Sequence, residues 1–260
     1  RYLENFYQVQ LFYHAGKKVE LTRAGELLRN SALTFKHDEI YLMRMLQDTA
    51  KNTRNFAFGA TLSVAEFMLP PDLERLICAY PQSHIRMEVG NTRELLSKLD
   101  AGELDFAVVE GEFPREEYEF LLYRKEPYVP VASRKKAEQY RNAEFRELLS
   151  ERLILREPGS GTREILEREL RRRGMTTDDF SQITELGNIG AIQAMLRANL
   201  GISFFYQATL TDRETQLAPI ELKDFSLEHE VMFIFRKNSS FREDYEEIYA
   251  FLTNRENSQN

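Results

Sequence analysis

Several features typical of exported, membrane-inserted or disulfide-stabilised proteins are missing from these 260 residues. The single cysteine, Cys78, excludes an intrachain disulfide and favours a reducing compartment, so we expect a cytoplasmic protein. No apolar run approaches the roughly 18 residues of a membrane-spanning helix, so no membrane partner is expected. The chain opens on Arg1-Tyr2-Leu3, with neither a signal peptide nor a starting Met, and we expect an upstream segment of a longer protein.

Patterns that carry catalysis or metal binding are also scarce. The four histidines, His14, His37, His84 and His229, do not have the spacing of metal ligands. Cys78 lies in an apolar helical run, which is typical of core packing rather than of a nucleophile. No G-x-S-x-G motif is present, and no pair of carboxylates stands out. We therefore expect no catalytic residue, no metal, no cofactor and no enzyme activity.

The composition is that of a globular chain with an uneven charge. Hydrophobic residues make up 42% and charged residues 30%, so a core and a solvated surface are both expected. The formal net charge is −7, yet residues 1–30 carry five basic and three acidic side chains. A weakly basic end on an acidic body is typical of a short DNA-facing module joined to a sensor domain.

The N-terminal part predicts a hairpin followed by a long helix. Two apolar runs, 11–13 and 19–21, flank a basic turn that contains Gly16, Lys17 and Lys18. Thr22 can cap a helix from 23 to about 52, which contains no proline. Its apolar residues fall mostly three or four apart, at Ala24, Leu28, Ala32, Phe35, Leu42, Leu46 and Ala50. Such a stripe favours pairing with a second helix, although a helix lying on its own domain remains open.

From residue 56 onward, strands and helices alternate, which predicts an α/β fold with a mostly parallel sheet. The expected strands are 56–60, 85–89, 104–109, 128–132, 153–155, 182–186, 202–206, 220–222 and 231–235. A polar loop at 61–63 is expected to lead into a first helix that ends near Tyr80. Further helices are expected at 93–101, 162–173, 191–198 and 241–253. Two such α/β units of similar size predict a ligand cleft at the carboxyl ends of their strands.

The loop at 157–163, Glu-Pro-Gly-Ser-Gly-Thr-Arg, is the sharpest local signal. A Gly-rich turn that follows a strand and opens a helix can hold an anion, because the first N–H groups of a helix are unpaired. It could equally be a tight turn in which Thr162 caps the helix. No Lys precedes Thr162, so the loop is not a P-loop. The hydroxyls of Thr61 and Ser63 could likewise cap a helix or face a ligand.

Three stretches together resemble LysR-type transcriptional regulators. The first runs from Leu3-Glu4 through Gly16-Lys17-Lys18-Val19-Glu20-Leu21-Thr22 to Ala24-Gly25, and it is similar to the end of a recognition helix, a wing and the start of a linker helix. The second comprises Pro70, Tyr80-Pro81 and Gly102-Glu103-Leu104-Asp105. The third joins Leu155 to Arg163 with Gly187, Ala191-Ile192 and Gly201-Ile202.

This resemblance implies a fold of two Rossmann-like subdomains of the type 2 periplasmic-binding-protein kind, preceded by a β-hairpin wing and a long linker helix. The expected domains are a winged helix-turn-helix remnant at 1–22, a linker helix at 23–53 and an effector-binding domain at 54–260. Within that domain, subdomain 1 would comprise 54–127 and 228–260, and subdomain 2 would comprise 128–227.

The resemblance further implies a DNA-binding regulator that senses a small, anionic metabolite. The implied effector-binding residues are Thr61, Ser63, Thr92, Ser160, Gly161, Thr162 and Asn188. The implied DNA-binding residues are Arg1, Lys17 and Lys18. The expected partners are promoter DNA, a small-molecule effector and further copies of the chain in a homodimer or homotetramer.

Two other functions share parts of this pattern. An exported solute-binding protein has the same sensor fold, but the basic hairpin and the long helix before residue 56 argue against it. An enzyme on a two-domain α/β scaffold would need a positioned acid, base or metal, which the sequence does not offer.

Overall fold

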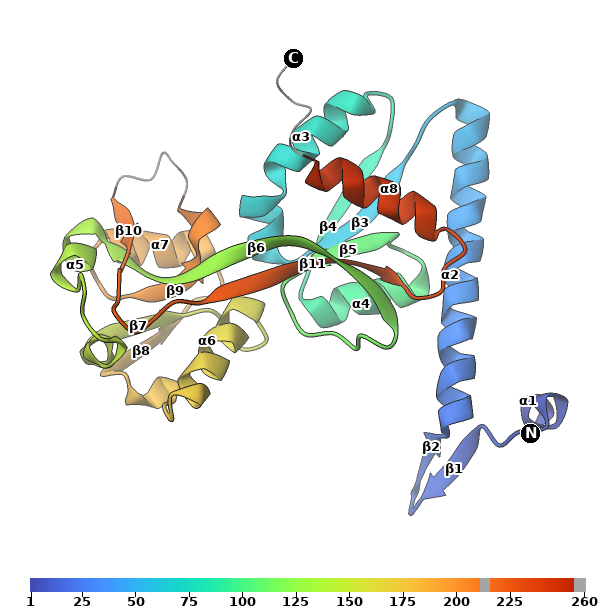
Figure 1. Cartoon of the computed structure of the whole chain (residues 1–260), viewed down its shortest axis with the longest axis horizontal. Coiled ribbons are helices and arrows are strands. Elements are labelled where there is room, and N and C mark those ends of the chain that lie inside the picture. The colour runs from blue at the N-terminus through green and yellow to red at the C-terminus, as the bar shows by residue number, and fades with distance from the viewer. Residues whose placement is uncertain (211–215, 255–260) are drawn as a thin grey trace.

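The computed structural model describes residues 1–210 and 216–254, and Figure 1 shows a long helix standing beside two α/β lobes. A short helix, α1 (Tyr2–Tyr7), precedes a hairpin of β1 (Phe12–Ala15) and β2 (Lys18–Leu21). The two strands pair antiparallel, and the chain turns at Gly16, whose φ of +65° favours glycine. The predicted hairpin is therefore confirmed.

The hairpin leads directly into helix α2 (Arg23–Lys51). As predicted, the Thr22 hydroxyl oxygen accepts a hydrogen bond from the backbone N–H of Gly25, at 3.1 Å. A Cβ at position 25 would lie 2.2 Å from the carbonyl oxygen of Leu11, so only glycine fits there. This close approach fixes the chain before the hairpin against the first turn of α2.

Helix α2 docks on its own chain through a face that combines polar residues with Tyr41 and Met45, and it leaves much of its predicted apolar stripe in solvent. Its buried residues include Thr34, His37 and Asp38, whereas Phe35 is 71% and Leu46 is 63% exposed. The alternative prediction, that this helix lies on its own domain, is therefore confirmed for the buried face of α2. The exposed stripe still requires an explanation of its own.

The docked face of α2 is held by hydrogen bonds to distant parts of the chain. His37 Nε2 lies 2.9 Å from the carbonyl oxygen of Leu104. The Asp38 carboxylate accepts from the Ser239 hydroxyl at 2.6 Å and from the backbone N–H of Ser240 at 2.7 Å. These contacts join the helix to two separate loops of the first lobe.

The first lobe is built on three parallel strands. β3 (Phe56–Ala60) lies between β4 (Ile85–Val89) and β5 (Phe106–Val109) in the sheet. Four helices complete the lobe: η1 (Val64–Met68), α3 (Pro70–Ala79), α4 (Thr92–Ala101) and α8 (Arg242–Thr253). Strand β5 also pairs antiparallel with β11 (Glu228–Arg236), so the sheet is mixed rather than purely parallel.

The helix after β3 begins earlier than predicted and is divided in two. Only Thr61 of the expected loop 61–63 is non-helical, because Leu62 and Ser63 already form a helical turn. The expected single helix up to Tyr80 is divided into a π-helical η1 and an α-helical α3, which starts at Pro70. Proline has no N–H and is favoured at the first position of a helix, so it sets this boundary.

Cys78 is exposed on α3, so its expected packing role is wrong. Its neighbour Ile77 is also 55% exposed, whereas Leu76 is buried. An apolar run that is continuous in the sequence points around the whole circumference of a helix, so only part of it can face the core.

The second lobe repeats the strand and helix alternation. Strands β7 (Arg152–Leu155) and β8 (Gln182–Glu185) are parallel, while β9 (Ser203–Tyr206) and β10 (Leu217–Pro219) pair antiparallel with β6 (Tyr118–Ser133). Its helices are α5 (Arg134–Gln139), η2 (Phe145–Ser150), α6 (Gly161–Arg172), η3 (Thr177–Asp179), α7 (Ile189–Arg197) and η4 (Gln207–Thr209). The strand expected at 220–222 lies three residues earlier, as β10.

Two long antiparallel strands, β6 and β11, connect the lobes (Figure 1). Their pairing extends from Tyr118 opposite Arg236 to Pro127 opposite Glu228. The sequence predicted only the second half of β6, because charged residues interrupt the apolar pattern at 124–126. The predicted subdomain boundary at 127/128 falls within β6, and the one at 227/228 falls at the start of β11. Both boundaries stay a prediction.

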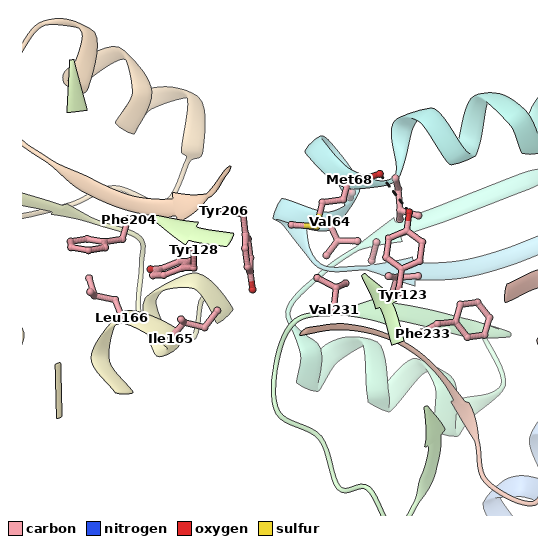
Figure 2. Packing of buried hydrophobic residues seen from close by; sticks show 14 of the residues in the cluster. Val64, Met68, Tyr123, Tyr128, Ile165, Leu166, Phe204, Tyr206, Val231 and Phe233 are labelled. Atoms are coloured by element: carbon pink, nitrogen blue, oxygen red, sulfur yellow. Dashed lines mark hydrogen bonds between the residues drawn. The ribbon is translucent and has the colours of Figure 1, made fainter. Parts of the chain in front are cut away.

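The buried core extends into both lobes, as Figure 2 shows. In the second lobe, Tyr128, Phe204 and Tyr206 lie beside Ile165 and Leu166 of α6. All five side chains are at most 3% exposed. Helix α6 is therefore anchored by burial of its apolar face, which holds its N-terminal turn in place beside the first lobe.

Candidate functional site

A pocket of about 310 Å³ lies where the carboxyl ends of β3 and β5 approach the start of α6. Four of the predicted effector residues line it: Thr61, Thr92, Ser160 and Gly161. Larger hollows of about 780 and 620 Å³ share lining residues with it. We take the smaller pocket as the site because it combines these hydroxyls with two buried charged groups, Glu110 and Arg156.

The first of these groups, Glu110, follows directly after β5, as Thr61 follows β3. The strands are parallel neighbours, with Ala60 opposite Val108, so their carboxyl ends meet. The Thr61 hydroxyl donates a hydrogen bond to Glu110 Oε2. Burial raises the pKa of Glu110 to about 7, although the Thr61 hydroxyl and the Arg156 charge oppose that change.

Glu110 also touches the opposite lobe. A Cβ on Gly161, the first residue of α6, would lie 3.2 Å from Cγ and 3.3 Å from Oε1 of Glu110. A glycine at this position therefore lets the carboxyl group approach the helix start closely. Glu110 is not among the effector-binding residues that the resemblance implied, because the sequence alone does not show which of its many acidic residues are buried.

Arg156 is the second charged group, and it was also missed. It is 7% exposed, and its guanidinium makes a two-pronged contact with Glu157, at 2.8 Å from Nε to Oε2 and 2.7 Å from Nη2 to Oε1. Burial opposes ionisation of Glu157, but this contact outweighs it and lowers the pKa of Glu157. The pocket thus contains a guanidinium whose carboxylate partner stays ionised.

The hydroxyls at the start of α6 lie close together. Ser160 Oγ and Thr162 Oγ1 are 2.9 Å apart, and the Ser160 hydroxyl makes no capping hydrogen bond to the first turn of α6. Ser160 is the N-cap residue, while the buried Thr162 lies inside the first turn, where its carbonyl accepts from the Tyr128 hydroxyl at 2.7 Å. The capping role considered for Thr162 is therefore wrong. The Ser160 hydroxyl contacts the Thr162 hydroxyl instead of a backbone N–H of the helix.

The other predicted effector residues are placed differently. Thr92 is the first residue of α4 and packs on Gly111, where a Cβ would lie 2.1 Å from its Oγ1. Ser63 is buried in the helical turn behind the pocket. Asn188 is exposed and caps α7, with its Oδ1 accepting from the backbone N–H of Ala191 at 2.9 Å. Neither Ser63 nor Asn188 is among the residues that line the pocket.

The predicted DNA-binding residues lie at the far end of α2 (Figure 1). Lys17 and Lys18 are both exposed and adjacent at the tip of the hairpin. Arg1 lies apart from them, directly before α1. The structure thus groups the two lysines and separates them from Arg1.

Within residues 1–210 and 216–254, no group of three His, Cys, Asp or Glu side chains is arranged to hold a metal ion. None of the helices in these ranges is long and apolar enough to cross a membrane.

Comparison with known proteins shows the family to which this chain belongs. Residues 50–256 match the family described as the LysR substrate binding domain. YeiE of Escherichia coli K12, an uncharacterized HTH-type transcriptional regulator, is 27% identical over 211 residues, which cover 81% of this chain and 70% of YeiE. The HTH-type transcriptional regulator CysL of Bacillus subtilis is 25% identical over 265 residues, covering 96% of this chain and 83% of CysL.

A solved structure supports the fold independently. The regulatory domain of Synechocystis CcmR, in complex with 2-PG, matches with a TM-score of 0.66 and 22% sequence identity, and the match covers 78% of this chain and 99% of that domain. This likeness confirms the predicted fold class.

Proposed function

Because the chain belongs to the LysR family of transcriptional regulators, we propose that its pocket binds a small oxyanion and thereby controls promoter binding. The observation that carries this proposal is that the buried Arg156 guanidinium lines the same pocket as Ser160 and the first residue of α6, Gly161. An oxyanion there would meet a charge-assisted donor, hydroxyl donors and the unpaired N–H groups of a helix. The family membership argues against the two alternatives, an exported solute-binding protein and an enzyme.

The proposed switch is a change in the relative orientation of the lobes. The pocket has walls from both lobes, with Thr61 and Thr92 on one side and Ser160 and Gly161 on the other. A ligand that bridges them favours one orientation only by its difference in affinity for the two. Ser63, Thr162 and Asn188 would support these walls from behind or from the rim. CcmR, whose regulatory domain shares this fold, was solved with 2-PG.

Replacing Arg156 with Gln tests the oxyanion site. Loss of one charge-assisted contact, worth about 1.5–3 kcal/mol, should weaken binding about 10- to 100-fold. Thermal-shift titration with sulfate, phosphate and small carboxylates provides the measurement. Arg172→Gln is the control, because Arg172 is 71% exposed at the far end of α6. Equal affinity of the Arg156 variant and the wild type for every anion that binds would contradict the assignment.

We further propose that the exposed stripe of α2 is the contact between two copies of the chain. Phe35, Leu42 and Leu46 are 71%, 44% and 63% exposed, and a face of this kind needs a partner surface. A pair of such helices can bury the stripe in the manner of a coiled coil, within a homodimer or a homotetramer.

The double substitution Phe35→Glu and Leu46→Glu should convert the oligomer to monomers, because two carboxylates would be placed in an apolar interface. Light scattering at micromolar concentration measures the mass. Leu200→Glu, at a residue 52% exposed on the second lobe, is the matched control and should leave the oligomer intact. A wild-type chain that is already monomeric at this concentration would refute the interface.

In the intact regulator, Lys17 and Lys18 are proposed to contact DNA phosphates together, and Arg1 is proposed to contact DNA separately from them. Replacing both lysines with Ala should weaken binding to all sequences alike and reduce the slope of log affinity against log salt by about 1–2. Fluorescence anisotropy at several salt concentrations provides the slope. Lys223→Ala, at an exposed residue of the second lobe, should change nothing. A loss confined to one operator with an unchanged slope would show base reading instead. With promoter DNA as its partner, the protein is proposed to act in the cytoplasm.

A further inference from the structure

The charged side chains that line the pocket would repel an anion if all of them were ionised. Among the described lining residues, Glu94, Glu110 and Glu157 provide three carboxylates against the one guanidinium of Arg156. If all three carboxylates were ionised, an entering oxyanion would meet a net negative wall. Protonation of one of them lowers the net charge of this wall from −2 to −1 and so favours the entry of an anion.

Glu110 is the carboxyl group that the structure allows to be neutral. Glu157 stays ionised because it is paired with Arg156, and Glu94 is exposed and accepts from the backbone N–H of Asn91 at 3.1 Å. Glu110, by contrast, is only 5% exposed, and its Oε2 accepts from Thr61. Its Oε1 lies beside the first turn of α6, where the oxyanion is proposed to bind.

Other titratable groups surround Glu110 from neighbouring elements. These groups are Arg156 and Glu157 before α6, Glu94 on α4, Tyr206 on β9, and Arg168 and His229 along the adjoining hollow. Burial raises the pKa of Tyr206 well above its usual value, so Tyr206 stays neutral. Burial lowers the pKa of His229 to about 4, so His229 is neutral as well. Glu110 is then the group near the pocket whose protonation changes around neutral pH, since burial raises its pKa to about 7.

We propose that the pocket binds its oxyanion together with one proton, shared between the anion and the Glu110 carboxyl group. This inference rests on the proposed oxyanion function of the same pocket. The proton can arrive in two ways. A neutral Glu110 donates a hydrogen bond to a fully deprotonated anion, or an anion that keeps a proton of its own donates to the Glu110 carboxylate.

The two routes predict different pH profiles for two simple probes. Sulfate has no proton near neutral pH, so its binding requires protonated Glu110. Its affinity should fall about tenfold for each pH unit above the pKa of that group. Hydrogen phosphate keeps one proton into strongly alkaline solution, so it can donate to the ionised carboxylate. The site should therefore discriminate against sulfate and for phosphate as the pH rises.

Isothermal titration calorimetry of the wild-type chain with sulfate and with phosphate, from pH 6 to pH 9, tests the inference. For sulfate we expect a loss of about 50-fold between pH 7 and pH 9, because about half of Glu110 is protonated at pH 7, and we expect uptake of up to one proton per anion. Uptake is read from the dependence of the heat on the ionisation enthalpy of the buffer. For phosphate we expect a change of less than about threefold over the same range.

Glu110→Gln is the decisive variant, because its amide supplies a permanent donor without a titrating proton. Its sulfate affinity should be nearly independent of pH, and it should lose the preference for phosphate. The matched control is Glu112→Gln. Glu112 is exposed two residues further along and pairs with Arg168 at 2.6 Å, outside this pocket. This control should keep the wild-type profile.

The outcomes separate this inference from the function on which it rests. Sulfate binding of constant affinity across the pH range in the wild type would overturn the shared proton and leave the oxyanion site standing. A pH dependence that persists in Glu110→Gln would also overturn it, because another group would be titrating. Absence of sulfate and phosphate binding at every pH, in both the wild type and the variant, would overturn the shared proton and the oxyanion function together.

Discussion

Replacing Arg236 with Met is expected to lower the free energy of unfolding by about 3 kcal/mol, because it breaks a buried ion pair and leaves a lone carboxylate. Arg236 lies at the end of β11 and is fully buried. Its Nη1 is 2.7 Å from Asp100 Oδ1, and its Nη2 donates to the carbonyl oxygen of Asn30 in α2 at 3.1 Å. The guanidinium carbon also lies 5.0 Å from the centre of the Tyr118 ring.

The magnitude is set at the lower end of the range for buried pairs because the Asp100 side chain is 21% exposed and keeps a hydrogen bond from the Tyr118 hydroxyl. Urea unfolding followed by circular dichroism gives the free energy. Adding Asp100→Asn to the Arg236 variant should recover part of the loss, since no unpaired charge remains.

Arg242→Met is the control for this experiment. Arg242 is 55% exposed and pairs with Glu246 on the surface of α8, so its loss should cost less than about 1 kcal/mol. An equal effect of both substitutions would mean that the buried network around Arg236 does not join α2 to the first lobe. A selective effect would show that the buried contacts of Arg236, which join β11 to α2, contribute to the stability of the fold.

Glu110→Gln is expected to stabilise the chain above neutral pH, by about 3 kcal/mol at pH 8 and by nothing at pH 4. The pKa of Glu110 is raised from 4.5 to about 7 on folding, so the folded state binds more protons than the unfolded state between those values. Wild-type stability therefore falls as the pH rises through this window, and the full cost is present above it. The span between the two values corresponds to about 3 kcal/mol.

The measurement is the difference in urea midpoint between variant and wild type at pH 4, 6 and 8. The difference is needed because His229, whose pKa burial lowers to about 4, destabilises both proteins equally as the pH falls below 6.5. Glu112→Gln, at an exposed carboxylate, should show no such pH-dependent gain. A Glu110 variant that is less stable than the wild type at pH 8 would mean that the ionised carboxylate is well solvated or paired in the folded chain.

Much of the local structure could be predicted from the sequence because it depends on neighbouring residues. The Thr22 cap, the turn at Gly16 and the start of α6 after a Gly-rich loop are each decided within a few residues. The errors arose where a local pattern was ambiguous. The apolar run around Cys78 suggested burial on both sides of a helix, and the charged residues at 124–126 concealed half of β6.

The candidate site was predictable only in part. The hydroxyls of Thr61 and Ser160 could be placed because each follows a strand of a different α/β unit, and a ligand cleft is expected at the carboxyl ends of the strands of both units. Glu110 and Arg156 could not be singled out, since the chain contains many acidic and basic residues and the sequence does not show which of them are buried. Burial is what gives these two groups their chemistry.

The sequence by itself determined the α/β alternation, the hairpin with its basic tip and the long capped helix, because periodicity, capping and turn chemistry act over a few residues. The tertiary structure decided which face of α2 would be covered, how β6 and β11 join the lobes, and that Glu110 would meet the start of α6. The physical reason is distance along the chain. These contacts join segments that are tens to hundreds of residues apart, so they form only when the whole core is packed.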